Sequence, residues 1–143
     1  MSVLAKPGIE IEWAGEFPMR RDSVSEARRT VSRLLPRLTW AGDRDDAVLV
    51  VSELATNAVL HAPANGASSF LLELAHLSDG ALMVAVSDHG DGPDRLPCGL
   101  PAEDAESGRG LYLVQQLGAR VVSEKSPSGG KRIAALLPPS KEL

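Results

Sequence analysis

The sequence is poor in cysteine and in aromatic residues. Cys98 is the single cysteine, and the aromatic residues are two tryptophans, two phenylalanines and one tyrosine. One cysteine cannot form an internal disulfide, and Cys98 has no Cys or His neighbours at zinc spacing, which fits a reducing cytoplasm. The few, scattered aromatic side chains exclude a stacking platform for nucleic-acid bases. We therefore interpret Trp13, Trp40, Phe17 and Phe70 as core residues.

The sequence also lacks a positive net charge and long apolar runs. A formal net charge of -4 argues against a general nucleic-acid surface. No run approaches the roughly 20 apolar residues that cross a bilayer, and residues 1–8 lack the apolar core of a secretion signal. With 143 residues, 43% of them hydrophobic, the chain has room for one domain with a substantial core. We expect a cytoplasmic protein with no direct contact to nucleic acid or membrane.

The two common nucleotide motifs are absent, since the chain has neither Gly-x-x-x-x-Gly-Lys-Ser/Thr nor Gly-x-Gly-x-x-Gly. A single polar stripe runs along an otherwise apolar helix predicted for residues 46–61. Glu53, Asn57 and His61 are four residues apart, so they lie on one side of that helix. Polar groups buried there need partners, because leaving them unpaired is costly. A ligand, internal core partners and solvent are the three alternatives.

Two glycine-rich segments follow, and each lies at a predicted boundary of a strand or helix. Residues 87–92 read Ser-Asp-His-Gly-Asp-Gly, and residues 107–111 read Ser-Gly-Arg-Gly-Leu. Glycines one residue apart allow a tight turn or a close approach of the backbone to a ligand. The second segment opens a helix, where free N–H groups favour phosphate, and Arg109 adds a cation suited to phosphate oxygens. Three distant features can therefore form one pocket.

The order of these motifs carries a family resemblance. Glu-x-x-x-Asn on a helix, then Asp-x-Gly-x-Gly after a strand, then Gly-x-Gly-Leu opening a helix resembles the GHKL ATP-binding superfamily. Within it, the chain looks like the small anti-sigma-factor serine/threonine kinases of bacteria. The resemblance implies that Asn57 is a Mg²⁺ ligand, that Glu53 is the general base and that Asp88 selects adenine. The remaining candidates for binding the nucleotide are His61, Gly90, Gly92, Gly108, Arg109, Gly110 and Leu111.

The resemblance also implies a function. The chain would be an ATP- and Mg²⁺-dependent protein serine kinase that binds a sigma factor and phosphorylates a serine on a STAS-type anti-anti-sigma protein. A homodimer is possible. Two departures leave phosphoryl transfer open: Glu106 stands where spore-type relatives carry a basic residue, and residues 128–131, Ser-Gly-Gly-Lys, lack the usual threonine. The alternative is a nucleotide-gated regulatory binding protein of the same fold without kinase activity.

For the fold, alternating strand and helix patterns predict an α+β domain. We expect a two-layer sandwich, with a mixed, mostly antiparallel sheet and helices on one face. Residues 1–14 are predicted as a tail and an edge strand, residues 15–137 as the histidine-kinase-like ATPase domain and residues 138–143 as a C-terminal tail. Three prolines and scattered acids over residues 93–107 predict a lid. The edge strand is expected over residues 9–13, where polar and apolar residues alternate.

Local signals place the other elements. Ser23 and Glu26 form a predicted capping box for a first helix that ends near Pro36. Arg28, Arg29 and Arg33 lie on or beside its polar side, which fits a solvated face or a partner-binding surface. Asp43 is the predicted N-cap of the second helix. Further segments are expected as strands over 70–77, 81–87, 119–125 and 131–137, with a short helix from residue 111 to 117.

Overall fold

The structure is a computed structural model, and it describes residues 10–60, 69–88, 112–125 and 130–139. A short helical segment over residues 112–116 lies between the third and fourth strands of the chain order. The predicted lid, residues 93–107, lies outside the described residues. The elements are β1 (Trp13–Pro18), α1 (Asp22–Leu34), the 3₁₀ helix η2 (Leu35–Arg37), α2 (Arg44–Leu60), β2 (Ser69–His76), β3 (Leu82–Asp88), β4 (Arg120–Lys125) and β5 (Lys131–Leu137).

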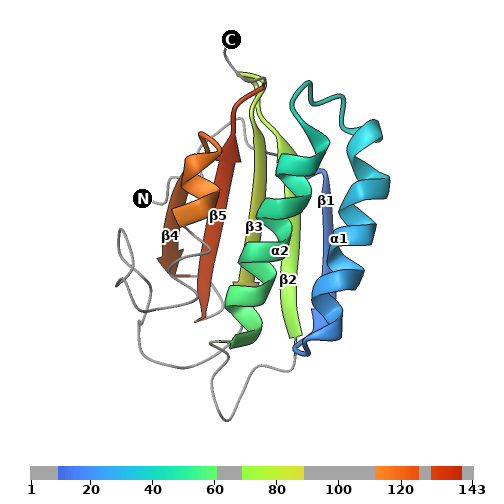
Figure 1. The fold of residues 1–143 in the computed structure, drawn as a ribbon, viewed down its shortest axis with the longest axis vertical. Coiled ribbons are helices and arrows are strands. Elements are labelled where there is room, and N and C mark those ends of the chain that lie inside the picture. The colour runs from blue at the N-terminus through green and yellow to red at the C-terminus, as the bar shows by residue number, and fades with distance from the viewer. Residues whose placement is uncertain (1–9, 61–68, 89–111, 126–129, 140–143) are drawn as a thin grey trace.

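The five strands form one sheet in the order β1-β2-β3-β5-β4. Every neighbouring pair of strands is antiparallel. Both long helices and the short helical segment lie on the same face of this sheet, with α1 beside α2 (Figure 1). The architecture confirms the predicted two-layer α+β sandwich.

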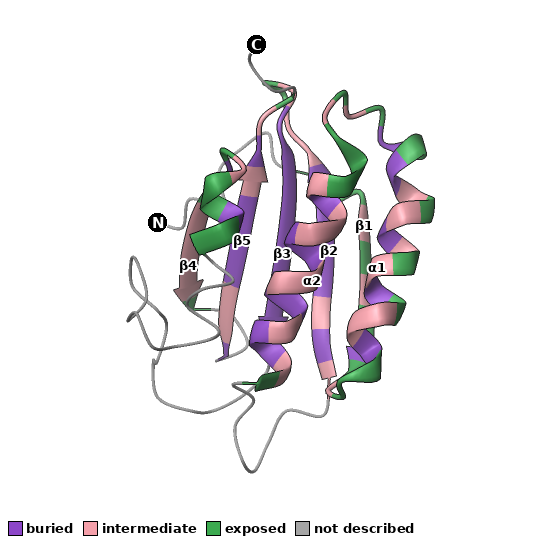
Figure 2. Cartoon of the chain, viewed as in Figure 1, coloured by how far each residue is buried: buried purple, intermediate pink, exposed green. Residues whose placement is uncertain are grey.

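The main core lies between the sheet and the helices. Alternate residues of β2 and β3 belong to this core together with the buried residues of α2. Figure 2 shows the buried stretches of these three elements. Burying each large aliphatic side chain there contributes about 1.5–3 kcal/mol relative to leaving it exposed. The largest side chains with less than 2% of their surface exposed in this core are Phe70, Leu54, Leu72, Leu74, Leu82, Val31, Val50, Val51, Val84, Leu137 and Val114.

The opposite face of the sheet carries a buried polar cluster, which four strands build from four side chains. Arg132 Nη2 lies 3.0 Å from Glu73 Oε1, and Nη1 lies 3.9 Å from Glu124 Oε2. Arg132 Nε donates a hydrogen bond to Ser87 Oγ at 3.2 Å. The Glu73 contact pairs the charges, although Oε1 has no well-angled hydrogen-bond donor. A small apolar cluster on the same face contains Ala75, Met83, Ala85 and Ala134.

α2 begins as the sequence predicts. Asp43 Oδ1 accepts hydrogen bonds from the backbone N–H groups of Asp45 at 2.7 Å and Asp46 at 3.3 Å. These bonds satisfy donors that have no partner within the helix, so Asp43 acts as the N-cap. The helix is apolar on most sides because it packs on both the sheet and α1. Among the described residues, no helix is long and apolar enough to cross a lipid bilayer.

α1 departs from its predicted start. The capping box at Ser23 and Glu26 is wrong, because the helix begins at Asp22 and Ser23 lies inside it with 1% of its surface exposed. Arg21 at the N-cap is already helical, and no side chain caps the helix. The N–H groups of Ser23 and Val24 instead donate to the carbonyl groups of Arg20 and Arg21, both at 3.1 Å. A preceding turn therefore replaces the capping side chain.

The edge strand is shifted along the chain. We expected it over residues 9–13, but β1 spans Trp13–Pro18 and pairs with β2. Phe17 anchors this register, because its ring stacks on Phe70 with centroids 5.5 Å apart. Gly15 and Pro18 are poor strand residues, so tertiary packing overrides their local preference here. The strand lies at the edge of the sheet, as expected.

The remaining predicted strands are found within one residue of their expected bounds. The turn between β2 and β3 contains Gly80 at φ +92°, and Ala81 N–H donates to Asp79 Oδ1 at 3.0 Å. Gly118, at φ +87°, follows the short helical segment before β4. β5 has the predicted bounds, Lys131–Leu137. Turn chemistry and alternation were therefore sufficient to predict β2, β3, β4 and β5.

One side-chain contact ties distant parts of the chain together. Trp40, between η2 and α2, donates from Nε1 to the carbonyl oxygen of Pro138 at 3.0 Å. Pro138 directly follows β5. The contact fixes the start of the predicted C-terminal tail against the helical layer.

Candidate functional site

The structure brings Asn57 and Asp88 to one small cavity. Asn57 lies near the C-terminal end of α2, and Asp88 is the last residue of β3. The two positions meet because α2 packs against β3 and β5. The cavity has a volume of about 10 Å³, and its lining residues are Leu54, Asn57, Ala58, Val86, Asp88, Lys131 and Ile133.

Asn57 presents an unpaired acceptor to this site. Its side chain has 3% of its surface exposed, and its carbonyl oxygen Oδ1 has no hydrogen-bond partner. A buried polar atom without a partner costs about 1–3 kcal/mol, so such an atom calls for a functional explanation. A cavity of this size holds about one water molecule. The amide oxygen is also the type of hard ligand that Mg²⁺ takes, so Asn57 fits the predicted metal ligand.

Asp88 supplies a carboxylate at the end of the central strand. It is buried, with 5% of its surface exposed, and Oδ1 accepts a hydrogen bond from the backbone N–H of Lys131 at 3.2 Å. A carboxylate held in this way can accept a further hydrogen bond from an exocyclic amine. This placement fits the predicted role of Asp88 in recognising adenine.

Gly130 is a site residue that the sequence analysis missed. A Cβ atom at this position would lie 2.1 Å from the Asp88 carbonyl oxygen and 2.5 Å from Asp88 Oδ1. The neighbouring atoms belong largely to the backbone, so only glycine allows β5 to start this close to Asp88. The signal was present in the glycine doublet before β5. The antiparallel pairing of Ser87 with Arg132 then places residues 130 and 131 beside Asp88.

Glu53 lies one turn before Asn57 on α2 and is half-buried. It does not line the small cavity. Within the described part of the chain, its carboxylate forms no ion pair and no side-chain hydrogen bond. An unpaired carboxylate one turn from the amide is available as a proton acceptor, which its predicted role as general base requires.

The other predicted site residues lie outside the described residues: His61, Gly90, Gly92, Glu106, Gly108, Arg109, Gly110 and Leu111. Within the described ranges, no group of three His, Cys, Asp or Glu side chains could hold a metal ion. A Mg²⁺ ion on Asn57 would therefore need ligands from elsewhere. Phosphate oxygens and water molecules are the usual ones, because Mg²⁺ commonly bridges protein to phosphate and keeps several waters.

A family comparison identifies the domain. Residues 17–135 match the model of the histidine kinase-like ATPase domain. The chain belongs to this family. The match spans β1 to β5 and includes Glu53, Asn57 and Asp88. A search of curated proteins found no match.

Solved structures share the fold. The histidine kinase domain of a blue-light activated histidine kinase from Erythrobacter litoralis is 22% identical, with a TM-score of 0.53 over 94% of this chain and 65% of that one. A second structure of that kinase has a TM-score of 0.56, and only 42% of it is covered. The chain thus spans less than two thirds of these two proteins. The ATP binding domain of PrrB from Mycobacterium tuberculosis is 24% identical, with a TM-score of 0.50 over 87% of this chain and 96% of that domain.

These comparisons agree with the geometry on a coarse assignment. The chain is a GHKL-type, histidine kinase-like ATP-binding domain. Its buried amide and its strand-end carboxylate face a common cavity. The family match includes both residues, and ATP binding is the property that defines these domains.

Proposed function

We propose that this chain is an ATP- and Mg²⁺-dependent protein serine kinase that acts as an anti-sigma factor in the bacterial cytoplasm. It would bind a sigma factor and transfer the γ-phosphoryl group of ATP to a serine on a STAS-type anti-anti-sigma protein. The single observation that carries the nucleotide part is the unpaired Oδ1 of Asn57 in a cavity shared with Asp88. The kinase and partner parts are supported by the motif resemblance and by the unpaired carboxylate of Glu53.

Asp88, Asn57 and Glu53 would each have a different role in phosphoryl transfer. Asp88 accepts a hydrogen bond from the exocyclic amine of adenine, and this bond orients the base. Asn57 would hold Mg²⁺, which neutralises charge on the phosphate oxygens when it is bound. Glu53 accepts the proton of the serine hydroxyl as its oxygen bonds to the γ-phosphorus. The bond from that phosphorus to the bridging oxygen breaks, and ADP leaves.

A second candidate function is a nucleotide-gated binding protein that transfers no phosphoryl group. Lys131 favours it, because it occupies the first position of β5, where many relatives carry a threonine, and it lines the cavity with Asn57 and Asp88. Such a protein would inhibit its partner by occupancy alone. The two functions share the nucleotide site and differ in the role of Glu53.

The test is transfer from [γ-³²P]ATP to purified STAS-type proteins, with the Glu53→Gln variant beside the native protein. We expect labelled serine with the native protein, and a fall of about 10²–10⁴-fold in rate with Glu53→Gln, which is typical for loss of a general base. Binding of ATP should change little in this variant, because the amide keeps the size of the side chain.

Two outcomes separate the candidates. Nucleotide binding without transfer to any STAS-type protein supports the binding protein and rejects the kinase. Calorimetry that detects no ATP binding in the presence of Mg²⁺ rejects both. Asn57→Ala serves as the reference variant, since it should lose binding and transfer together.

A further inference from the structure

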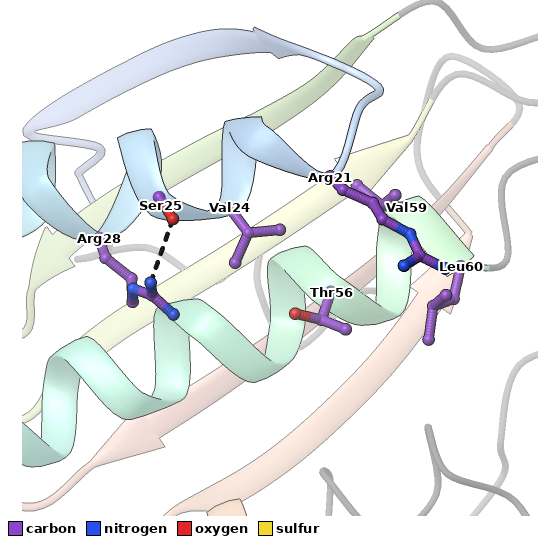
Figure 3. Close-up of a pocket in the computed structure, with 7 residues that line it drawn as sticks. All are labelled: Arg21, Val24, Ser25, Arg28, Thr56, Val59 and Leu60. Atoms are coloured by element: carbon purple, nitrogen blue, oxygen red, sulfur yellow. Dashed lines mark hydrogen bonds between the residues drawn. The ribbon is translucent and has the colours of Figure 1, made fainter.

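A groove between the two long helices lies apart from the small cavity at Asp88. Its volume is about 380 Å³, far larger than that cavity, and none of its lining residues is shared with it. Figure 3 shows side chains from the first half of α1 facing the C-terminal half of α2. The lining residues are Arg21, Val24, Ser25, Arg28, Thr56, Val59 and Leu60.

The groove holds two cations, Arg21 and Arg28, that no carboxylate of the described residues neutralises. Arg28 donates only to hydroxyl groups, from Nη1 to Ser52 Oγ and from Nη2 to Ser25 Oγ, both at 3.1 Å. In the described part of the chain, neither Arg21 nor Arg28 forms an ion pair. By contrast, Arg20 pairs with Asp22 and Arg132 pairs with Glu73. The groove arginines are therefore available to an anion from outside.

The surrounding charge strengthens this contrast. Residues 20–37 contain six arginines and two acidic residues, although the whole chain has a net charge of -4. Among the described residues that line the groove, none is acidic. A basic groove on an otherwise acidic protein attracts anionic partners and repels cationic ones.

The donors can converge on a single group. Arg21 is the helical N-cap of α1, and Arg28 lies on α1 seven residues later. The two therefore lie on one line of the helix, and a point midway is roughly 5 Å along the axis from each Cα. In Figure 3 the Arg28 guanidinium lies beside Ser25 and the Arg21 guanidinium lies beside Val59 and Leu60, so both would turn toward that point to share one anion. Thr56 faces the same space from α2, and its hydroxyl makes no hydrogen bond in the described structure. The Ser25 hydroxyl accepts a bond from Arg28, which leaves its own proton free to be donated.

The two positive charges of the groove favour a phosphorylated side chain over a carboxylate. A carboxylate would neutralise one of the two guanidinium groups, whereas a phosphorylated side chain carries about -1.5 to -2 charges and three acceptor oxygens. Arginine pairs well with phosphate, since its planar fork makes two parallel hydrogen bonds. Val24, Val59 and the 45% exposed Leu60 offer an apolar surface to residues that flank the phosphate.

We propose that this groove binds a phosphorylated serine or threonine segment of a partner protein. The phosphate would lie between Arg21, Arg28 and Thr56, and apolar neighbours of the phosphorylated residue would pack on Val59 and Leu60. The described lining residues of the groove differ from those of the small cavity at Asn57 and Asp88, so peptide binding can be tested apart from the kinase activity proposed above. A kinase with such a groove would hold phosphorylated protein at a second surface.

The test measures binding of a fluorescent heptapeptide with a central phosphoserine and leucine at the two flanking positions on each side. Matched peptides carry serine or glutamate at the centre, and the full chain is used with saturating ATP and Mg²⁺. We expect the phosphoserine peptide to bind at least about tenfold more tightly than the other two, because charge-assisted hydrogen bonds to phosphate are the strong ones.

Variants locate the binding. Arg21→Gln and Arg28→Gln should each weaken binding of the phosphoserine peptide by about tenfold or more. Arg29→Gln is the matched control, because Arg29 is an exposed arginine on the same helix that does not line the groove, and it should bind like the native protein. Thr56→Val tests the hydroxyl without removing charge, and the circular dichroism of each variant reports whether it is folded.

Three outcomes would overturn the proposal. Equal binding of the glutamate and phosphoserine peptides would make the groove a general acidic-peptide surface. Unchanged binding in the folded Arg21→Gln/Arg28→Gln double variant would place the peptide elsewhere. Competition by ATP, or loss of binding in Asn57→Ala, would place it at the nucleotide site. Failure of ATP binding alone would reject the proposed function and leave this inference standing.

Discussion

Buried polar side chains lie on both faces of the same sheet, and the two groups differ in whether their polar atoms have partners. On the far face, Arg132 joins Glu73, Glu124 and Ser87, so each charge has an opposite charge nearby. On the helical face, Asn57 has 3% of its surface exposed, and within the described residues its carbonyl oxygen has neither an opposite charge nor a hydrogen-bond donor. The charges of the first group are paired with one another, whereas the Asn57 carbonyl oxygen is left as an acceptor, which the proposed role of Asn57 as a metal ligand requires.

The largest effect should come from breaking the paired group. Arg132→Met should lower the free energy of unfolding by about 3 kcal/mol, because it leaves Glu73, with 8% of its surface exposed, without its cation. Urea denaturation measures this change. Arg29→Met, at an exposed position, is the control and should stay within about 0.5 kcal/mol of the native value. A native-like stability for Arg132→Met would show that the cluster contributes nothing.

Replacing the Asn57 amide should lower ATP affinity strongly and change the free energy of unfolding little. Asn57→Leu should lower ATP affinity by about 100-fold, or ~2.7 kcal/mol, since it removes the proposed metal ligand. Its stability should stay within about 1 kcal/mol of native, because an apolar group of similar size replaces an unsatisfied one. Calorimetry and urea denaturation give the two values. A stability loss as large as that of Arg132→Met would mean that Asn57 is structural.

Gly130→Ala tests the start of β5, the strand that contributes Arg132 to the paired group and Lys131 to the cavity at Asn57. Its Cβ would overlap the Asp88 carbonyl oxygen, so the start of β5 must move away. We expect a stability loss of about 2 kcal/mol, typical of overpacking, together with weaker ATP binding. Hydrogen exchange of the Lys131 amide, which donates to Asp88, should become faster. Unchanged exchange at Lys131 would contradict the close approach.

The smallest effect should come from trimming the paired group. Ser87→Ala removes the acceptor for Arg132 Nε and should cost about 1 kcal/mol of stability, the usual value of one hydrogen bond. ATP affinity should be unchanged, because Ser87 faces away from the nucleotide site. A drop in ATP affinity would show that the two faces of the sheet are coupled.

Prediction from sequence worked where short-range chemistry decides. Asp43 is a capping residue whose contacts lie within three positions, and the turn at Gly80 depends on a local backbone angle. The α+β sandwich followed from alternation and from motif order. Spacing and resemblance predicted Glu53, Asn57 and Asp88 as site residues, and the structure places Asn57 and Asp88 at one cavity.

Prediction failed where distant parts of the chain decide. The register of β1 depends on Phe17 stacking on Phe70, a contact that local alternation over residues 9–13 does not encode. Ser23 has the chemistry of a cap, but the backbone of Arg20 and Arg21 already occupies that role. Gly130 required the pairing of β3 with β5 before its contact with Asp88 became visible. The Arg28 bridge to Ser52 likewise depends on how α1 packs on α2.

The hydrogen bond from Trp40 to Pro138 gives the domain an intrinsic optical reporter. It joins the linker before α2 to the residue that follows the last strand, 98 positions away. Separation of β5 from the helical layer would expose the indole to water and shift its fluorescence to longer wavelength. Cleavage by a carboxypeptidase that removes Pro138 would produce the same spectral change, so in a Trp13→Phe background the fluorescence of Trp40 can follow the integrity of the C-terminal end.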